Sequence, residues 1–247
     1  MNSCAVTDIG QLRQSNQDFV YASDHALGNL ENFYMVADGM GGHQGGGFAS
    51  RYAVERMTEL LEADRRHEAV PALNAALDEV NRELYRKAGS FDELRGMGTT
   101  VVAATVSEGI LYVLNIGDSR LYLVNDGIRQ VTRDHSWVEE MIAQGKLVRG
   151  SELYYQKKNV ITRAVGVNEW VAADFFEIEL QPGDRILLCS DGLSNMVPDE
   201  EILETIKQYG SCREAAFRLI QQANANGGKD NISVVIADPE RSEEEVC

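Results

Sequence analysis

The sequence predicts an α+β fold in which antiparallel β-sheets carry helices on their outer faces. Short β-branched or aromatic runs, bounded by Gly, Asp and Asn, indicate strands. Two dipeptides, Glu108-Gly109 and Asp126-Gly127, are tight-turn signals between neighbouring runs and therefore predict hairpins. Helical patterns come in pairs between groups of strands, which disfavours a doubly wound parallel sheet. The predicted strands cover residues 33–37, 99–106, 110–115, 121–124, 185–190 and 232–237.

Four segments are predicted to be helices from their apolar spacing or their start signals. A short apolar stripe follows Ala49, Ser211 and Glu214 form a capping box at the start of another helix, and Pro198-Asp199 begins a further one. The clearest helix has an amphipathic stripe at alternating steps of three and four residues. The stripe consists of Val70, Leu73, Leu77, Val80 and Leu84.

Composition limits the classes of function open to the chain. Its 247 residues include 23 Lys and Arg against 39 Asp and Glu, so the formal net charge is −16. This charge argues against nucleic-acid binding, which gains affinity by neutralising phosphates, and against docking on an anionic membrane. No apolar run approaches the roughly 18 residues that a membrane helix needs.

The chain is predicted to form one domain over residues 1–240, followed by an acidic tail at 241–247. No internal repeat and no Pro- or Ser-rich linker divides it. The four cysteines include no Cys-x-x-Cys pair, and the N-terminus lacks the plan of a signal peptide. We therefore expect reduced thiols in a cytoplasmic protein, and we also expect a monomer.

Acidic residues beside glycine or asparagine mark the ends of several predicted strands. Asp38, Asp118 and Asp191 follow strands, and Asp230 comes just before one. In an antiparallel arrangement these ends can meet at one edge, where carboxylate oxygens would suit Mg²⁺ or Mn²⁺. The alternative is that each such pair only marks a turn.

A glycine-dense loop follows Asp38 and leads into a helix. Glycine lets a backbone pass close to a ligand, and the absence of a Gly-Lys-Ser/Thr sequence excludes a P-loop. His43 lies in this loop, five residues after Asp38. It is either an ordinary polar loop residue or a general acid.

These residues belong to a series of motifs by which the chain resembles the metal-dependent serine/threonine phosphatases of type 2C, the PPM family, and its bacterial branch in particular. The resemblance implies two antiparallel sheets stacked as a β-sandwich, with pairs of helices on both outer faces. Its eight fragments occur in the family's order at residues 13–18, 36–43, 96–100, 115–120, 132–136, 161–166, 190–193 and 229–233.

The resemblance also implies a metal centre. Asp18 would support the metal-bound waters, and Asp118 together with Asp191 matches a third, weaker site. Two Mg²⁺ or Mn²⁺ ions would be held by Asp38, the Gly39 carbonyl, Asp191 and Asp230.

The reaction that the resemblance implies is hydrolysis of phosphoserine and phosphothreonine in phosphoproteins. A hydroxide bridging the two ions would attack phosphorus, Arg13 would grip the phosphate, and His43 would protonate the leaving group. The expected partner is a Ser/Thr protein kinase, whose action the enzyme would reverse. Two residues depart from the family pattern, because Gln17 and Gly47 stand where many relatives have Glu. We expect weaker binding of the second ion from the first departure and a small effect on helix onset from the second.

The stretch at about 136–162 corresponds in the resembling family to a mobile flap beside the metal centre. It begins with a predicted turn of helix at 137–142. Several basic residues there could help a phosphopeptide approach an otherwise acidic protein. They are Lys146, Arg149, Lys157 and Lys158.

Two other classes of function remain open. Gly117-Asp118-Ser119 could belong to a serine hydrolase, but none of the four histidines lies in the C-terminal third, where the usual late Asp–His pair would be. A catalytically weak phosphatase-like domain could bind a partner or sense a metal. The retained Asp38, Asp191 and Asp230 favour the enzyme.

Overall fold

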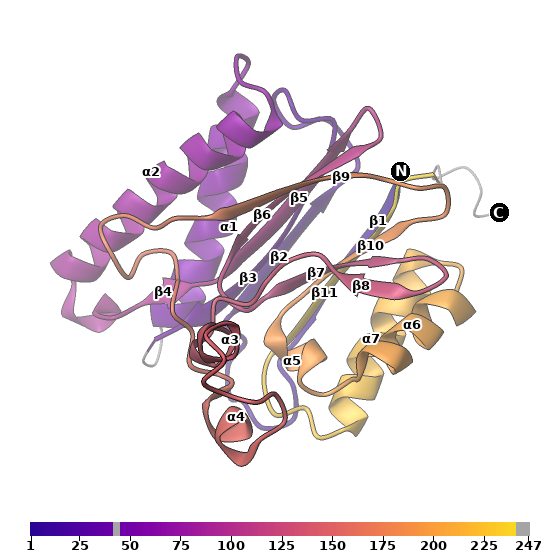
Figure 1. Ribbon diagram of the computed structural model, residues 1–247. Coiled ribbons are helices and arrows are strands. Elements are labelled where there is room, and N and C mark those ends of the chain that lie inside the picture. Colours follow the sequence, from indigo (N-terminus) through magenta and orange to yellow (C-terminus); the bar gives the residue numbers. More distant parts are fainter. Residues whose placement is uncertain (42–44, 241–247) are drawn as a thin grey trace.

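Two antiparallel β-sheets form the centre of the molecule (Figure 1). The computed structural model describes residues 1–41 and 45–240, so the predicted tail at 241–247 lies outside the described residues. The five-stranded sheet consists, in spatial order, of β1 (Asn2–Asp8), β11 (Ile232–Asp238), β10 (Arg185–Cys189), β7 (Arg120–Val124) and β8 (Ile128–Gln130). The other sheet consists of β2 (Asp18–Ser23), β3 (Phe33–Met40), β5 (Val101–Ser107), β6 (Ile110–Ile116) and β9 (Asp174–Glu179), with the short β4 (Gly98–Thr99) paired to β3.

Helices cover the outer face of each sheet (Figure 1). The sheet that contains β3 carries α1 (Gly45–Ala63) and α2 (Ala69–Ser90), and the sheet that contains β10 carries α6 (Asp199–Gln208) and α7 (Cys212–Ala225). This arrangement confirms the predicted fold class. The shorter elements are η1 (Asp92–Leu94), α3 (Trp137–Ala143), α4 (Glu152–Lys157) and α5 (Asp191–Ser194).

The side chains of β3 show how the four layers are held together. Phe33 and Met35 pack against α1 and α2, whereas Tyr34 and Val36 point to the opposite sheet. Successive residues of a strand face opposite sides of a sheet, so this strand contributes to two hydrophobic cores at once. A third core lies between the five-stranded sheet and its helices. The central strands are therefore apolar on both faces, which explains why they form continuous apolar runs in the sequence.

The edge strands differ from the sequence-based prediction, whose ranges do not include β1, β2, β8 or β9. These strands lie at the outer positions of the two sheets. Most of their residues are only partly buried. An edge strand tolerates polar residues because its outer side has no neighbour, so its hydrophobic signal is weak.

The first and last strands of the chain pair with each other. β1 runs antiparallel to β11, with Asn2 opposite Asp238 and Asp8 opposite Ile232. β11 in turn pairs with β10. The strand β11 therefore joins β1 to the other strands of the five-stranded sheet.

Several segments from distant parts of the chain meet at one end of the sandwich. In the β2–β3 ladder Asp18 lies opposite Asp38, and at the same end β10 leads into Asp191 while Asp230 leads into β11. One detail corrects the prediction, because Asp38 lies inside β3 and not after it. The strand continues to Met40 by pairing with β4.

No helix in the described parts of the chain is both long enough and apolar enough to cross a membrane.

Candidate metal centre

A pocket of about 310 Å³ opens at the end of the sandwich where these segments meet. It draws residues from both sheets and from the flap. Five residues predicted to bind metal line it together with the predicted phosphate-binding residue Arg13, whereas His43 lies outside the described residues. The five are Asp38, Gly39, Asp118, Asp191 and Asp230.

Backbone contacts fix the position of Asp38 and Gly39. The Asp38 N–H donates to Thr100 Oγ1 at 3.0 Å, and the Thr100 N–H donates to the Asp38 carbonyl at 2.9 Å. A Cβ atom on Gly39 would lie 2.1 Å from the Gly46 carbonyl oxygen and 2.6 Å from that of Gln17. Only glycine fits at position 39, between Gln17 and the start of α1, so the backbone of β3 can pass beside the pocket.

Asp191 reaches the pocket from the first residue of α5. Its Oδ2 accepts a hydrogen bond from Asn195 Nδ2 at 2.9 Å, while its buried Oδ1 has no hydrogen-bond partner. A Cβ atom on Gly192 would lie 1.9 Å from the carbonyl oxygen of Asn231. This close approach of α5 to the start of β11 places Asp191 beside Asp230.

Asp18 lies behind the pocket and is not among the described residues that line it. Its side chain is 4% exposed, and Oδ2 accepts hydrogen bonds from Ser190 Oγ at 2.8 Å and Ser233 Oγ at 2.7 Å. Its Oδ1 has no hydrogen-bond partner. The sequence alone predicts no role for these two serines, although both lie within the family motifs at 190–193 and 229–233. The arrangement suits a supporting carboxylate better than a direct ligand.

Arg13 lies at the rim of the pocket. Its side chain is 50% exposed, and Nη2 lies 2.7 Å from Asp230 Oδ2. Asn231 holds the loop that carries Arg13, because its Nδ2 donates to the carbonyls of Ile9 and Ser15 and its Oδ1 accepts from the Gln17 N–H. Asn231 lies within the motif at 229–233, but its structural role depends on tertiary contacts that the sequence does not show.

Burial and mutual repulsion raise the pKa values of the carboxyl groups around the pocket. The pKa of Asp38 lies well above its usual value, chiefly because of burial and then because of Asp18 and Asp191. Burial, followed by Asp118 and Asp230, raises the pKa of Asp191 to about 8. Burial and the nearby Asp134 raise the pKa of Asp118 to about 6. Each of these carboxyl groups therefore resists ionisation when no cation is near.

The residues fit a divalent cation. Buried oxygens without partners and carboxyl groups that repel one another are what a bound cation would satisfy. In the described parts of the chain no three His, Cys, Asp or Glu side chains converge closely enough to hold one ion by themselves. Mg²⁺ commonly keeps several waters and uses one or two carboxylates, so a pocket of separate aspartates with a nearby carbonyl suits it.

The raised pKa values predict that the metal-free protein loses stability as pH rises. Unfolded aspartates titrate near 3.8, so between that pH and about 8 the folded state binds more protons than the unfolded state. The free energy of unfolding should therefore fall across this range. We expect the thermal midpoint in EDTA to drop by about 5 °C or more between about pH 5 and about pH 8.

Two variants test the origin of this loss. Asp191→Asn should flatten the pH dependence, whereas Asp126→Asn, in an exposed turn, should leave it unchanged. Added Mn²⁺ should also reduce it by stabilising the ionised carboxylates. An equal pH dependence in both variants would place the responsible groups elsewhere.

The segment at 136–162 borders the pocket. Its backbone closes on itself where the Trp137 N–H donates to the Val160 carbonyl at 2.8 Å, and Asn159 and Ile161 line the pocket. Three of its four basic residues have side-chain partners. Lys146 donates to Gln144, Arg149 forms an ion pair with Glu139, and Lys158 donates to Asn195. Lys157 is exposed.

The arrangement around Ser119 does not match a serine hydrolase. Ser119 is buried, and its hydroxyl lies 2.7 Å from Thr100 Oγ1. His135 accepts a hydrogen bond from the Gly117 N–H at Nδ1, and its Nε2 lies 3.1 Å from Asp174 Oδ2. Burial lowers the pKa of His135. A neutral imidazole that bridges Gly117 and Asp174 orders the loop before Asp118 and does not activate the serine.

The sequence is similar to known phosphatases over most of its length. The family model described as Protein phosphatase 2C matches residues 11–233. The serine/threonine phosphatase stp of Listeria innocua serovar 6a is 39% identical over 240 residues, which cover 94% of this chain and 93% of the relative.

Two solved structures have the same fold. The serine/threonine phosphatase Stp1 from Staphylococcus aureus has a TM-score of 0.90 and 33% identity, with 97% of this chain and 95% of that chain covered. The catalytic domain of the serine/threonine protein phosphatase PstP, in complex with two manganese ions, has a TM-score of 0.84 and 35% identity over 96% and 97% of the two chains.

Proposed function

The chain belongs to the protein phosphatase 2C family and is a serine/threonine protein phosphatase that uses Mg²⁺ or Mn²⁺, and from this premise we propose how its pocket works. The pocket hydrolyses phosphoserine and phosphothreonine directly, with water as the nucleophile and without a phosphoenzyme. The observation that supports this most strongly is the group of aspartates in the pocket, whose charges repel one another, beside the exposed Arg13.

Two divalent cations would be held by the carboxylates of Asp38, Asp191 and Asp230 and by the Gly39 carbonyl. When bound, they would supply a deprotonated water as the nucleophile and would neutralise charge on the phosphoryl oxygens. Asp18, behind the pocket, would hold the waters around them. Asp118 would add a third, weaker position next to Asp191.

Arg13 would receive the phosphate group. Its guanidinium is at the rim and already lies against a carboxylate, so a phosphate arriving between the rim and the aspartates would meet a planar donor that can bind two oxygens. Gln17, also in the pocket lining, brings no formal charge where many relatives have Glu. The second cation would accordingly be held less tightly. A side chain at Gly47 would meet only ordinary contacts at 3.8 Å, which supports a small effect of that departure.

The substrates would be phosphoproteins modified by a Ser/Thr protein kinase. The acidic surface disfavours nucleic acid as a partner. Cys4, Cys189 and Cys212 are free thiols, which suits the reducing cytoplasm. One chain supplies every residue of the proposed site, which supports a monomer as the active form.

Release of phosphate from a phosphoserine peptide tests the proposal. The purified protein should release phosphate when Mn²⁺ is present and should stop when EDTA is added. Activity that persists in EDTA would contradict the metal-dependent reaction. Manganese binding without any phosphate release would instead favour a metal-sensing or partner-binding domain.

A further inference from the structure

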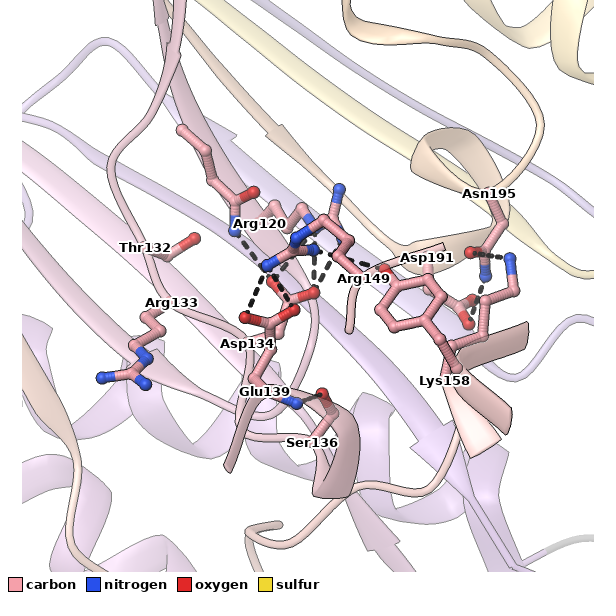
Figure 2. A network of polar contacts seen from close by, with 12 residues as sticks. Arg120, Thr132, Arg133, Asp134, Ser136, Glu139, Arg149, Lys158, Asp191 and Asn195 are labelled. Atoms are coloured by element: carbon pink, nitrogen blue, oxygen red, sulfur yellow. Dashed lines mark hydrogen bonds and ion pairs between the residues drawn. The ribbon is translucent and has the colours of Figure 1, made fainter. Parts of the chain in front are cut away.

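A chain of two hydrogen bonds connects the flap to one of the proposed metal ligands. Lys158, which directly follows α4 in the flap, donates from Nζ to Asn195 Oδ1 at 2.7 Å. Asn195, at the end of α5, donates from Nδ2 to Asp191 Oδ2 at 2.9 Å. In Figure 2 dashed lines join Asn195 to Lys158 and to Asp191.

The hydrogen-bonding capacity of the three groups fixes the direction of this chain. A lysine ammonium can only donate, so it needs the oxygen of the Asn195 amide, which leaves the amide nitrogen to donate to Asp191. The Oδ2 atom of Asp191 is thereby occupied, while the buried Oδ1 atom has no partner.

The environment of Lys158 differs from that of its neighbour. Lys158 is partly buried and borders a small cavity that Asp118 and Asp191 also line, whereas Lys157 is exposed. Burial lowers the pKa of Lys158, and the charge of Asp191 opposes this effect. A desolvated lysine needs a partner, and Asn195 at the end of α5 can be that partner only while the flap stays against α5.

We propose that Lys158 and Asn195 are positioning residues that latch the flap onto α5 and aim the unpartnered oxygen of Asp191 into the pocket. The inference rests on the proposed function, because it concerns a ligand of the proposed metal centre. A substrate that displaces the flap would thereby disturb Asp191. The position of the flap and the orientation of Asp191 are thus coupled through the side chains of Lys158 and Asn195.

Amide hydrogen exchange of the metal-free protein tests the latch. Lys158→Met should speed exchange in the flap helices about tenfold, because a hydrogen bond to a charged group is lost. Asn195→Ala should produce the same change, and the double variant should be no faster than either one, because both break a single connection. Lys158→Arg should retain slow exchange. Lys157→Met, which removes the same charge from the adjacent exposed position, should exchange like the wild type.

Calorimetric titration with Mn²⁺ tests the second half of the inference. Loss of a side chain that orients a ligand commonly weakens metal binding by tenfold or more, so Asn195→Ala should bind Mn²⁺ about tenfold more weakly than wild type. Wild-type affinity in Asn195→Ala, or equal flap exchange in Lys158→Met and Lys157→Met, would overturn the inference. A wild-type protein that neither binds Mn²⁺ nor releases phosphate would overturn the proposed function instead, while the metal-free exchange result would stand.

Discussion

Asp38→Ala is expected to reduce phosphate release by about a thousandfold or more at saturating Mn²⁺. Asp38 lies in β3 opposite Asp18 and lines the pocket together with Asp191 and Asp230. Cation chemistry contributes several kcal/mol to a phosphoryl-transfer barrier, and each tenfold in rate corresponds to about 1.4 kcal/mol. Without this carboxylate the pocket should hold the cations poorly, so that contribution should be lost. Steady-state kinetics with a phosphoserine peptide measures the effect.

The same variant should remain folded. The raised pKa of Asp38 means that its ionised form destabilises the metal-free protein at neutral pH, so alanine should leave the thermal midpoint in EDTA unchanged or higher. Asp126→Ala, on an exposed turn, controls for loss of one surface charge. Near-normal turnover by a folded Asp38→Ala protein would rule out the two-cation arrangement.

His43→Ala is expected to slow hydrolysis of a phosphoserine peptide by about a hundredfold or more. The residue lies outside the described parts of the chain, so this expectation rests on its position five residues after Asp38 in the sequence. A serine alkoxide is a poor leaving group and needs a proton. An activated aryl phosphate does not, so its hydrolysis should suffer much less.

Parallel rate measurements on the two substrates provide the comparison. A large loss on the peptide with a small loss on the aryl phosphate would identify a proton donor. Equal losses would mean that His43 has a structural role in the loop and does not protonate the leaving group.

The central strands were the part of the fold most accessible to sequence reasoning. The run at 33–37 has no polar interruption because Phe33 and Met35 enter one core while Tyr34 and Val36 enter another. β9, in contrast, has acidic residues at 174, 177 and 179 among its apolar ones, since it lies at the edge of its sheet and is at most partly buried. Such a strand has little to distinguish it locally from a loop.

The sequence predicts those residues of the candidate site that are recognisable from their type and from their position at a strand end. Asp191 and Asp230 could be identified because an acid next to Gly or Asn at a strand end is recognisable. The roles of Asn231 and Asn195 could not be identified, because each depends on atoms more than 30 residues away in the chain. Their contacts exist only after the sheets and the flap have come together.

The pairing of β1 with β11 has a consequence for the order in which the protein can form during synthesis. The sheet that contains β3, with α1 and α2, can be complete when residue 179 has emerged from the ribosome, but β1 must wait for residue 232 and beyond. At about 5–20 residues per second, this wait lasts several seconds.

A nascent chain in that interval carries Asp38 and Asp118 but lacks Asp230. The polar residues of β1, among them Asn2, Ser3 and Thr7, make its unpaired edge a poor template for pairing with another chain. Catalytic competence should therefore arise in a single step, when the last strand closes the sheet and delivers the final carboxylate.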